Sequence, residues 1–304
     1  MTGARGMVGQ NLLECPGLGV HEWLTPDRRE LDLRDQASVV RWLKEHKPEM
    51  ILHAAGRVGG IQANIESPVE FLIENLDLGR NILMGAYEAG IERVLNLGST
   101  CMYPRAAVNP LREDMVLQGA LEPTNEGYAL AKVMTQRLGA YLNREYGTRY
   151  KTLIPCNLYG RWDKFDPERS HLVPAVLRKL HEAKTKASPT VEIWGAGTAR
   201  REFMDAADLA DFMIQAISRY DELPDLMNVG LGYDFEINEY YYEGAKVVGY
   251  TGAFQHNLSK PVGMQQKLAD VQRLRQFGWT APTTLATGMA RAYEFYLNQN
   301  RGLE

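Results

Sequence analysis

Short apolar runs alternate with longer amphipathic segments along the first half of the chain. The apolar runs lie at 50–55, 93–99 and 150–160, with the sequences MILHAA, RVLNLGS and YKTLIPCNLYG. Apolar side chains three and four residues apart predict one helix over about 71–90 and another over about 128–146. Strands that alternate with helices indicate βαβ units, so we expect an α/β fold with a doubly wound, Rossmann-type parallel sheet.

The pattern loosens after Gly160 into a polar loop followed by shorter helices and strands. The segment DAADLADFMIQAIS, residues 205–218, predicts a helix that begins at its acidic first residue. We expect residues 1–160 to form a first domain, to which 205–230 returns. Residues 161–304 are expected to form mainly a smaller C-terminal domain.

Composition and charge narrow the class of protein. The 304 residues carry a net charge of -4, and no run of Lys and Arg resembles a nucleic-acid footprint, so no nucleic-acid partner is expected. The N-terminus does not have the pattern of a signal peptide, and no apolar run reaches the roughly 18 residues that a membrane span needs. We therefore expect a cytoplasmic protein without a membrane partner. Cys15, Cys101 and Cys156 are widely spaced, so neither a bound metal nor a disulfide framework is expected.

The chain opens with MTGARGMVGQ, a glycine-rich turn with almost no strand in front of it. Gly3, Gly6 and Gly9 have the spacing of a turn that joins a strand to the helix whose N-terminus receives a dinucleotide pyrophosphate. Only Met1 stands where about five apolar strand residues are expected. We predict that the loop binds a dinucleotide, that the first strand of the sheet is missing, and that the natural polypeptide starts several apolar residues upstream.

Two arginines bear on which dinucleotide is bound. Arg5 lies inside the glycine turn, and Arg28 ends a predicted second strand in the stretch VHEWLTPDRRE. An arginine at this position pairs with a 2′-phosphate, whereas an acidic residue accepts from a free 2′-hydroxyl. We therefore favour NADP over NAD, although the neighbouring Asp27 leaves the NAD interpretation open. The alternative is that both arginines are ordinary solvated side chains.

The stretch GYALAK contains a tyrosine and a lysine four residues apart on a predicted helix. Tyr128 and Lys132 should therefore project from one face. An ammonium near a phenol is expected to lower the pKa of the phenol and to make it a usable proton donor. An incidental pair on a solvated helix is the alternative.

The stretch GSTCMYP follows the apolar run at 93–99, where ligands of parallel sheets bind. If the backbone is extended, Ser99, Cys101 and Tyr103 point to one side. Ser99 is then placed to hydrogen-bond a carbonyl oxygen, and Cys101 to exchange a proton with carbon. The alternative for Cys101 is a small buried hydrophobic residue.

Taken in order, the glycine turn, Ser99 and Tyr128-x-x-x-Lys132 resemble the extended short-chain dehydrogenase/reductase family. Longer stretches resemble, more narrowly, the GDP-L-fucose synthases, which are GDP-4-keto-6-deoxymannose 3,5-epimerase/4-reductases. These stretches are VGGI (58–61), GSTCMYP (98–104), LQGALEPTNEGYALAK (117–132), NLYG (157–160), SHLVPA (170–175), WGAGTARREF (194–203) and KVVGY (246–250). The resemblance runs from Thr2 to the C-terminal region.

The resemblance implies a reaction and a role for each matching residue. Tyr128 would protonate the C4 oxygen while NADPH delivers hydride to C4, Lys132 would hold the nicotinamide ribose, and Ser99 would orient the carbonyl. Cys101 and His171 match the pair that moves protons at C3 and C5, although residue type alone favours a structural role for His171. A homodimer through the helices near 70–90 and 128–146 is also implied.

Binding residues are implied in the same way, with the first domain holding the cofactor and the second the sugar nucleotide. The cofactor set is Gly3, Arg5, Gly6, Gly9, Arg28, Asp32, Ala54, Ala55, Tyr128 and Lys132. The substrate set is Asn157, Lys179, Trp194, Arg201 and Lys267.

The chain also departs from the family pattern. Arg57 stands where a lysine is common, and Val262 stands where an acidic residue is common. A related GDP-4-keto sugar, of the 3,6-dideoxy or heptose type, therefore remains open as the substrate for the same or reductase-only chemistry. A nucleotide-binding regulator without catalysis is the alternative from another class, but Ser99, Tyr128 and Lys132 are all retained.

Overall fold

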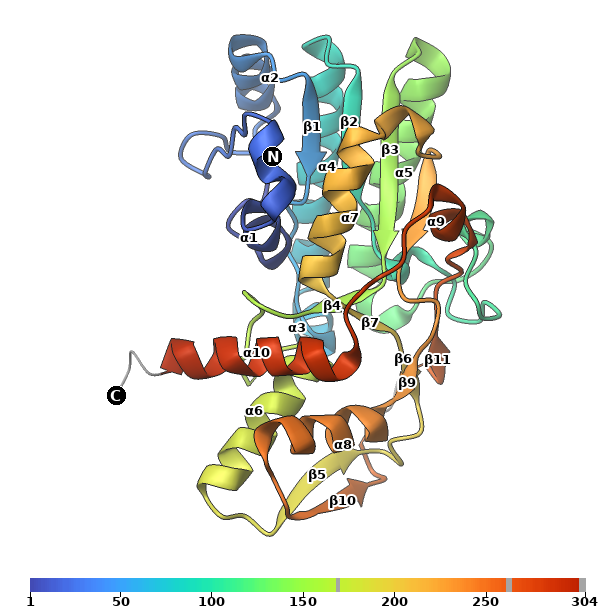
Figure 1. The fold of residues 1–304 in the computed structure, drawn as a ribbon. Coiled ribbons are helices and arrows are strands. Elements are labelled where there is room, and N and C mark those ends of the chain that lie inside the picture. Colours follow the sequence, from blue (N-terminus) through green and yellow to red (C-terminus); the bar gives the residue numbers. More distant parts are fainter. Residues whose placement is uncertain (168–169, 261–263, 301–304) are drawn as a thin grey trace.

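A computed structural model describes residues 1–167, 170–260 and 264–300, and its centre is a four-stranded parallel sheet. Side by side across the sheet lie β1 (Met50–His53), β2 (Arg93–Leu97), β3 (Arg149–Pro155) and β8 (Leu226–Val229) (Figure 1). Beyond the edge at β1, Thr2 forms a single parallel bridge with His53. The prediction of an α/β fold built on a parallel sheet is confirmed.

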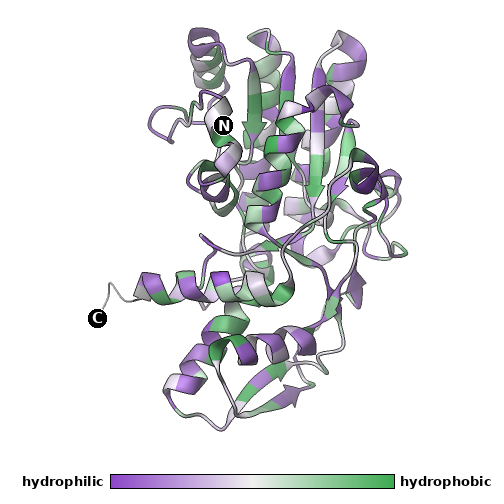
Figure 2. Ribbon diagram, in the orientation of Figure 1, coloured by the Kyte–Doolittle hydropathy of each residue, from purple (hydrophilic) through white to green (hydrophobic). Residues whose placement is uncertain are grey.

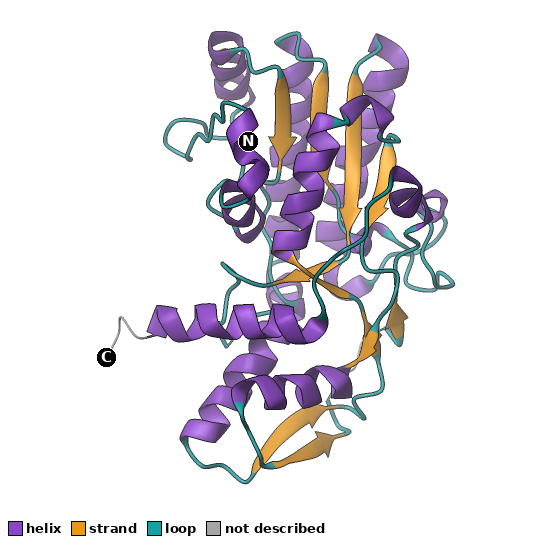
Figure 3. Ribbon diagram, in the orientation of Figure 1, coloured by secondary structure: helices purple, strands orange, loops and turns teal. Residues whose placement is uncertain are grey.

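Helices cover both faces of this sheet, as Figure 3 shows. One face carries α1 (Met7–Leu13), α7 (Ala206–Ser218) and α9 (Gln272–Phe277), and the other carries α2 (Gln36–His46), α4 (Pro68–Glu88) and α5 (Glu126–Tyr146). Successive strand residues point to opposite faces, so Ile51 packs in one core and Leu52 in the other. Because both faces are buried, the strands are mostly apolar, and Figure 2 shows hydrophobic stretches along them. Each strand also contains a buried polar residue: His53, Asn96, Lys151 with Thr152, and Asn228.

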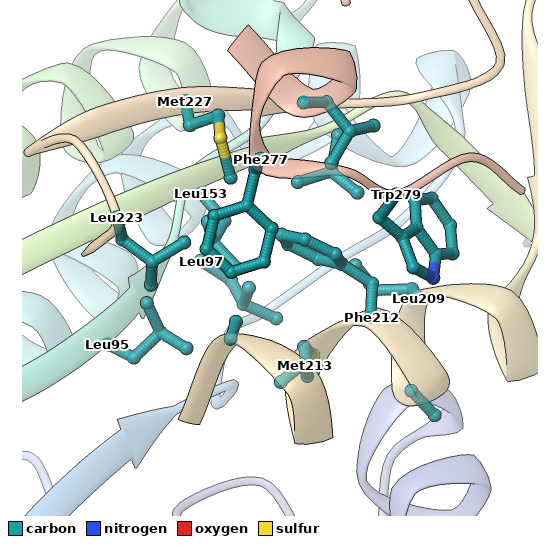
Figure 4. Packing of buried hydrophobic residues seen from close by; sticks show 14 of the residues in the cluster. Leu95, Leu97, Leu153, Leu209, Phe212, Met213, Leu223, Met227, Phe277 and Trp279 are labelled. Carbon is teal, nitrogen blue, oxygen red and sulfur yellow. The ribbon is translucent and has the colours of Figure 1, made fainter. Parts of the chain in front are cut away.

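Aromatic rings fill the core between the sheet and α7. Phe212 of α7 lies 5.7 Å from Phe277 and 5.1 Å from Trp279, measured between ring centroids, and Figure 4 shows these rings against leucines of the strands. Asp205 begins α7 as predicted, because its side chain accepts from the backbone N–H of Ala207. This packing fixes the chain region 205–230 against the sheet.

The second half contributes a separate apolar core below the sheet in Figure 1. Its helices are α6 (Leu172–Thr185), α8 (Ile237–Val248) and α10 (Leu285–Asn300), and its paired strands are β5 (Thr190–Trp194) with β10 (Ala253–Asn257). Between the two cores lie β4 (Asn157–Tyr159) with β7 (Phe203–Asp205), and β6 (Arg200–Arg201) with β9 (Phe235–Glu236) and β11 (Gln266–Lys267). The exact domain boundaries remain a prediction.

Short helices complete the described chain. They are α3 (Ile61–Glu66) and the 3₁₀ helices η1 (Pro16–Val20), η2 (Thr100–Met102), η3 (Glu113–Met115), η4 (Pro123–Asn125) and η5 (Tyr220–Glu222). Across residues 1–167, 170–260 and 264–300, no helix has both the length and the apolar character needed to cross a bilayer.

The prediction of a strand that ends at Arg28 is wrong. Residues 22–27 are irregular, and the Met1 ammonium, which donates to the carbonyl oxygen of Leu24 at 2.6 Å, lies beside them. A strand needs a ladder of backbone partners, and one hydrogen bond does not provide it. Beside β1, Thr2 N–H donates to the Leu52 carbonyl (2.9 Å) and the Thr2 carbonyl accepts from Ala54 N–H (3.3 Å).

Candidate active site

Tyr128 and Lys132 lie on the first turns of α5 and face the carboxyl end of β2. The Lys132 ammonium donates to the carbonyl oxygen of Leu97, the last residue of β2, at 2.9 Å. It lies 5.8 Å from the centroid of the Tyr128 ring. The four-residue spacing on one helix therefore brings both side chains to the edge of the sheet where ligands of this fold bind.

The pKa of Tyr128 is raised, not lowered, so the expected effect of Lys132 is wrong. Burial raises this pKa above its usual value of 10, the nearby Cys101 raises it further, and a hydrogen bond with the Ser99 side chain lowers it in part. Burial also lowers the pKa of Lys132 to about 8, and its ammonium is engaged by the Leu97 carbonyl. The phenol consequently keeps its proton at neutral pH, as a proton donor must.

The backbone after β2 turns into η2 instead of continuing extended. Ser99 begins this turn, and its Oγ accepts from Cys101 N–H at 3.2 Å. The expected alternation of Ser99, Cys101 and Tyr103 onto one side is therefore wrong. Tyr103 is buried, and its hydroxyl donates to Asn228 Oδ1 at 2.6 Å. Serine caps turns readily, which explains the local conformation.

Cys101 is partly buried, and two nitrogen donors lie against its sulfur. Asn125 Nδ2 is 3.0 Å from Cys101 Sγ, and Lys267 Nζ is 3.6 Å from it. Lys267, predicted at the sugar nucleotide, thus lies beside the predicted proton-transfer residue. Asn125 was not predicted as a site residue, because an asparagine just before a helix is an ordinary cap by sequence alone.

His171 is the residue immediately before α6, at the N-cap position of that helix. Burial lowers the pKa of His171, and the nearby Lys164 lowers it further. The VGGI segment lies close by, since a Cβ on Gly60 would be 3.7 Å from the carbonyl oxygen of Ser170. Between His171 and Cys101, both within the described residues, there is no direct hydrogen bond.

The glycine turn fits tightly against the loop after β1. Gly3 has φ 74°, and a Cβ there would lie 2.7 Å from the backbone of Ala54 and Ala55. A Cβ on Gly9 would lie 2.5 Å from the Gly3 carbonyl oxygen, whereas at Gly6 the same oxygen is 3.4 Å away. Packing within the protein therefore requires glycine at positions 3 and 9, and the absence of a side chain at Gly6 leaves the turn, a glycine cradle, open to close approach of a pyrophosphate.

Thr2 joins this cradle to β1. Its Oγ1 accepts from Ala55 N–H at 3.3 Å and is hydrogen-bonded to His53 Nδ1 at 2.8 Å. Burial lowers the pKa of His53 to about 3, and the charges of Lys132 and the N-terminus add to this effect. The imidazole is therefore neutral, and the small residues Ala54 and Ala55 are held in place beneath the glycine turn.

The charged residues around the predicted adenosine end form ion pairs at the surface. Arg5 pairs with Asp27 (2.9 Å) and Arg28 with Glu74 (3.4 Å), yet both arginine side chains are 81% exposed. Asp27 also accepts from Arg29 N–H at 2.7 Å.

Asp32, the residue predicted near the adenine, is engaged locally. It pairs with Arg34 at 2.7 Å, and hydrogen bonds from Arg34 lower the pKa of Asp32 to about 2. Its carboxylate is therefore charged throughout the physiological pH range.

The predicted substrate residues come from several short strands and from helix α6. Arg201 on β6 is the register partner of Lys267 on β11, so two cations lie side by side. Asn157 on β4 donates from Nδ2 to the backbone carbonyl of Glu202 at 3.1 Å.

Two lysines flank the Trp194 ring. Lys179 Nζ lies 5.3 Å and Lys260 Nζ lies 5.2 Å from the ring centroid. Lys260 was not predicted. Val262, the departure that bears on the sugar nucleotide, lies outside the described residues.

Glu202 is a buried carboxylate that sequence reasoning missed. It is 1% exposed, and its oxygens accept from the backbone N–H groups of Leu231 (2.6 Å), Gly232 (2.9 Å) and Ala269 (2.8 Å). Burial raises the pKa of Glu202 to about 7, and these three hydrogen bonds oppose the shift. The side chain therefore fixes two loops next to Arg201, and only long-range contacts reveal this role.

Arg57, the other departure, stabilises the start of α4. Its guanidinium pairs with Glu70 at 2.5 Å and with Glu74 at 3.1 Å, and it lies 5.2 Å from the centroid of the Phe71 ring.

A parallel sheet covered on both faces, a glycine cradle and a Ser–Tyr–Lys group at the strand ends define a nicotinamide-dinucleotide enzyme. Residues 1–230 match the NAD dependent epimerase/dehydratase family, and the chain belongs to this family. It is an enzyme of the NAD(P)-dependent oxidoreductase and epimerase type, as predicted.

Individual relatives cover the whole chain. The GDP-L-colitose synthase of Yersinia pseudotuberculosis is 50% identical over 300 residues, 98% of this chain and 97% of that protein. The GDP-L-fucose synthase of Azorhizobium caulinodans is 43% identical over 304 residues, 100% and 97% of the two chains. The GDP-mannoheptose C4 reductase of Campylobacter jejuni, solved with NADP bound, is 31% identical with a TM-score of 0.87, covering 97% of this chain and 96% of that one. The predicted resemblance to GDP-L-fucose synthases is confirmed.

Proposed function

We propose that this chain catalyses the NADPH-dependent 3,5-epimerisation and 4-reduction of GDP-4-keto-6-deoxy-D-mannose to GDP-L-fucose. The observation that carries the proposal is the meeting of Ser99, Tyr128, Lys132 and Cys101 at the carboxyl end of β2. The relatives named GDP-L-fucose synthase and GDP-L-colitose synthase support a GDP-sugar as the substrate class.

Reduction of the C4 ketone requires a hydride on carbon and a proton on oxygen. Bound NADPH supplies the hydride to C4. We assign the proton to the Tyr128 hydroxyl, whose raised pKa keeps it protonated until the alkoxide forms. The Ser99 hydroxyl orients the carbonyl, and the Lys132 ammonium holds the nicotinamide ribose.

Epimerisation uses the same ketone, because a carbonyl at C4 acidifies the C–H bonds at C3 and C5. We assign Cys101 as the base: its sulfur takes the proton from carbon, and the electron pair of the broken C–H bond moves to the C4 oxygen as an enolate. The imidazolium form of His171 then donates a proton to the opposite face of that carbon, which inverts the carbon and leaves His171 as neutral imidazole. Reduction of the ketone then fixes the new configuration.

NADP is the proposed cofactor, in preference to NAD. The glycine cradle suits either pyrophosphate, but Arg5 and Arg28 present two exposed guanidinium groups where a 2′-phosphate would lie. Asp27 is engaged with Arg5 and with the Arg29 backbone, so it is poorly placed to accept from a ribose hydroxyl. The related reductase structure with NADP bound supports the same choice.

For the GDP moiety we propose Arg201, Lys179, Trp194 and Asn157. A planar guanidinium binds two phosphate oxygens at once, and the burial that lowers the pKa of Arg201 strengthens such a contact. Lys267 reaches toward Cys101 and therefore belongs at the sugar end of the substrate.

A 3,6-dideoxy sugar is the second candidate substrate. The specific observation in its favour is the 50% identity to the GDP-L-colitose synthase, against 43% to the fucose synthase above. On such a sugar the proposed machinery would act at C5 and C4. Side-chain roles are the same for both substrates.

We also propose a homodimer that forms through α4 and α5. Val69 and Ile73 are exposed on α4, and Leu130, Met134 and Tyr141 are exposed on α5. Each set follows the spacing of one helix face, and the two helices are neighbours in Figure 1.

Isotope incorporation tests the reaction directly. The protein is incubated with GDP-4-keto-6-deoxymannose and NADPH in heavy water, and the product is analysed by NMR. We expect deuterium at C3 and C5 together with NADPH oxidation. Reduction without deuterium at both carbons would overturn the epimerase half. The Tyr128→Phe variant is the control, since exchange should continue while NADPH oxidation falls about a hundredfold or more.

The same assay distinguishes the two substrates. NADPH oxidation is compared for GDP-4-keto-6-deoxymannose and for its 3-deoxy analogue under matched conditions. A higher kcat/KM for the 3-deoxy sugar would reassign the protein to the second candidate.

A further inference from the structure

Asn125 stands at the N-terminal boundary of α5 but does not act as a helix cap. Asparagine is one of the residues preferred at this position, because its side-chain oxygen can accept from a backbone N–H of the first turn. Here the side chain makes no such hydrogen bond. Its Oδ1 is buried and has no hydrogen-bond partner among the described residues. The orientation of the amide is therefore not explained by any hydrogen bond to the helix.

The orientation is explained by what lies on the other side of the amide. Nδ2 of Asn125 donates to Cys101 Sγ at 3.0 Å, and Lys267 Nζ donates to the same sulfur at 3.6 Å. An amide nitrogen and an ammonium have hydrogens to donate and no acceptor capacity. A sulfur contacted by two such groups acts as hydrogen-bond acceptor only, which is the role that a base must have.

We propose that Asn125 is a positioning residue for Cys101, holding its sulfur as a hydrogen-bond acceptor ready to take a proton from carbon. This rests on the proposed function of Cys101 as the base in epimerisation. Asn125 itself is assigned no contact with the substrate. The Oδ1 atom of Asn125 does not cap the helix because the Nδ2 group of the same amide is hydrogen-bonded to Cys101 Sγ.

Two variants separate this role from a structural one. Ser and Asp both cap helices well, so Asn125→Ser and Asn125→Asp should keep α5 intact and leave the melting temperature unchanged or higher. Neither supplies an amide donor to Cys101, and the aspartate places a negative charge beside the sulfur. We expect the reactivity of Cys101 to be highest in the wild type, lower in N125S and lowest in N125D.

The readout is alkylation of each cysteine by iodoacetamide at neutral pH, followed by peptide mass spectrometry. Cys15 is also partly exposed and serves as the internal control in every sample. Loss of a single hydrogen bond typically changes a rate or an equilibrium by a factor of about ten. We expect the Cys101 rate to fall about tenfold in N125S and further in N125D, with the Cys15 rate unchanged.

Deuterium incorporation at C3 and C5 is measured on the same proteins. A parallel fall in alkylation and incorporation supports the proposal. A fall in alkylation with full incorporation supports the contact but overturns Cys101 as the base, which is the failure of the proposed function. Unchanged alkylation in N125S, or equal rates in N125S and N125D, overturns the positioning role whatever the activity.

Discussion

The ammonium of Lys132 lies where little water reaches it. The residue is 8% exposed, and its hydrogen bond goes to the Leu97 carbonyl oxygen. Burial lowers its pKa from 10.5 to about 8, because a charge is costly in such surroundings without a full counter-charge. The buried charge of Lys132 therefore lowers the free energy of unfolding of the protein without cofactor.

Stability should depend on pH through this residue. Between pH 8 and 10.5 the unfolded chain keeps the Lys132 proton and the folded protein releases it, so the free energy of unfolding rises with pH. The shift corresponds to about 3 kcal/mol in total. We expect the difference between wild type and Lys132→Met, measured by urea unfolding without cofactor, to rise by that order across this range. A difference that stays flat with pH would contradict the buried charge.

Single residues also set the limits of what the sequence can reveal about the site. The spacing of Tyr128 and Lys132 predicts a shared helix face, and the structure has them there. The direction of the Tyr128 pKa shift was predicted wrongly, because it depends mainly on burial, which the spacing of the two residues does not reveal. Asn125 and Glu202 could not be found from their residue types, since each acts through contacts that only folding creates.

At the scale of elements, the glycine turn and α1 depend on close backbone packing. A Cβ on Gly9 would meet the Gly3 carbonyl oxygen at 2.5 Å and Ala4 Cα at 2.6 Å, and neither is a side chain that can move away. A Cβ on Gly6 would meet only the Gly3 oxygen, at 3.4 Å. Gly9 is therefore needed for packing of the turn itself, whereas Gly6 is needed only where a ligand approaches the turn.

Alanine substitutions should separate these two roles. We expect Gly9→Ala to lower the melting temperature and to weaken NADPH binding at least tenfold, because the turn must shift. Gly6→Ala should weaken binding similarly with little loss of stability, because its Cβ enters the exposed side of the cradle. Gly19→Ala, where a Cβ would meet nothing within 4 Å, is the control and should change neither. NADPH fluorescence titration and thermal melting measure both quantities, and equal stability loss at Gly6 and Gly9 would refute the distinction.

Elements were predicted well where periodicity alone decides them. Strands β1, β2 and β3 and helices α4, α5 and α7 follow from apolar spacing, since each must bury a face whatever its neighbours are. Strand β8 was not predicted. The strand expected to end at Arg28 failed because a strand needs a hydrogen-bonded partner strand, and residues 22–27 are irregular. The extended backbone expected after β2 failed because one serine side chain, Ser99, closes a turn locally.

At the scale of the whole molecule, α4 and α5 expose apolar side chains to water, which is unfavourable for a monomer. Ile73 is 49% exposed and Met134 is 54% exposed, on two neighbouring helices. Apolar side chains grouped on adjacent elements are typical of an interface. The proposed homodimer would remove them from water.

Charges placed on this surface should dissociate the dimer. We expect the double variant Ile73→Lys, Met134→Lys to sediment as a monomer at concentrations where the wild type is a dimer, because two like charges would be buried twice at a symmetric interface. Val108→Lys, at a residue 78% exposed away from these helices, is the matched control and should remain dimeric. Analytical ultracentrifugation measures the state, and a monomeric wild type would contradict the proposal at once.

The carboxylate of Glu202 bears on how such a site can diversify. It accepts from the main-chain N–H groups of Leu231, Gly232 and Ala269, so the backbone of the loop after β8 and of the segment after β11 is held through main-chain contacts. Side chains along these segments are then free to be exchanged during evolution while the backbone stays in register. A scaffold of this kind can acquire a preference for a different sugar through a few substitutions and keep its catalytic geometry unchanged.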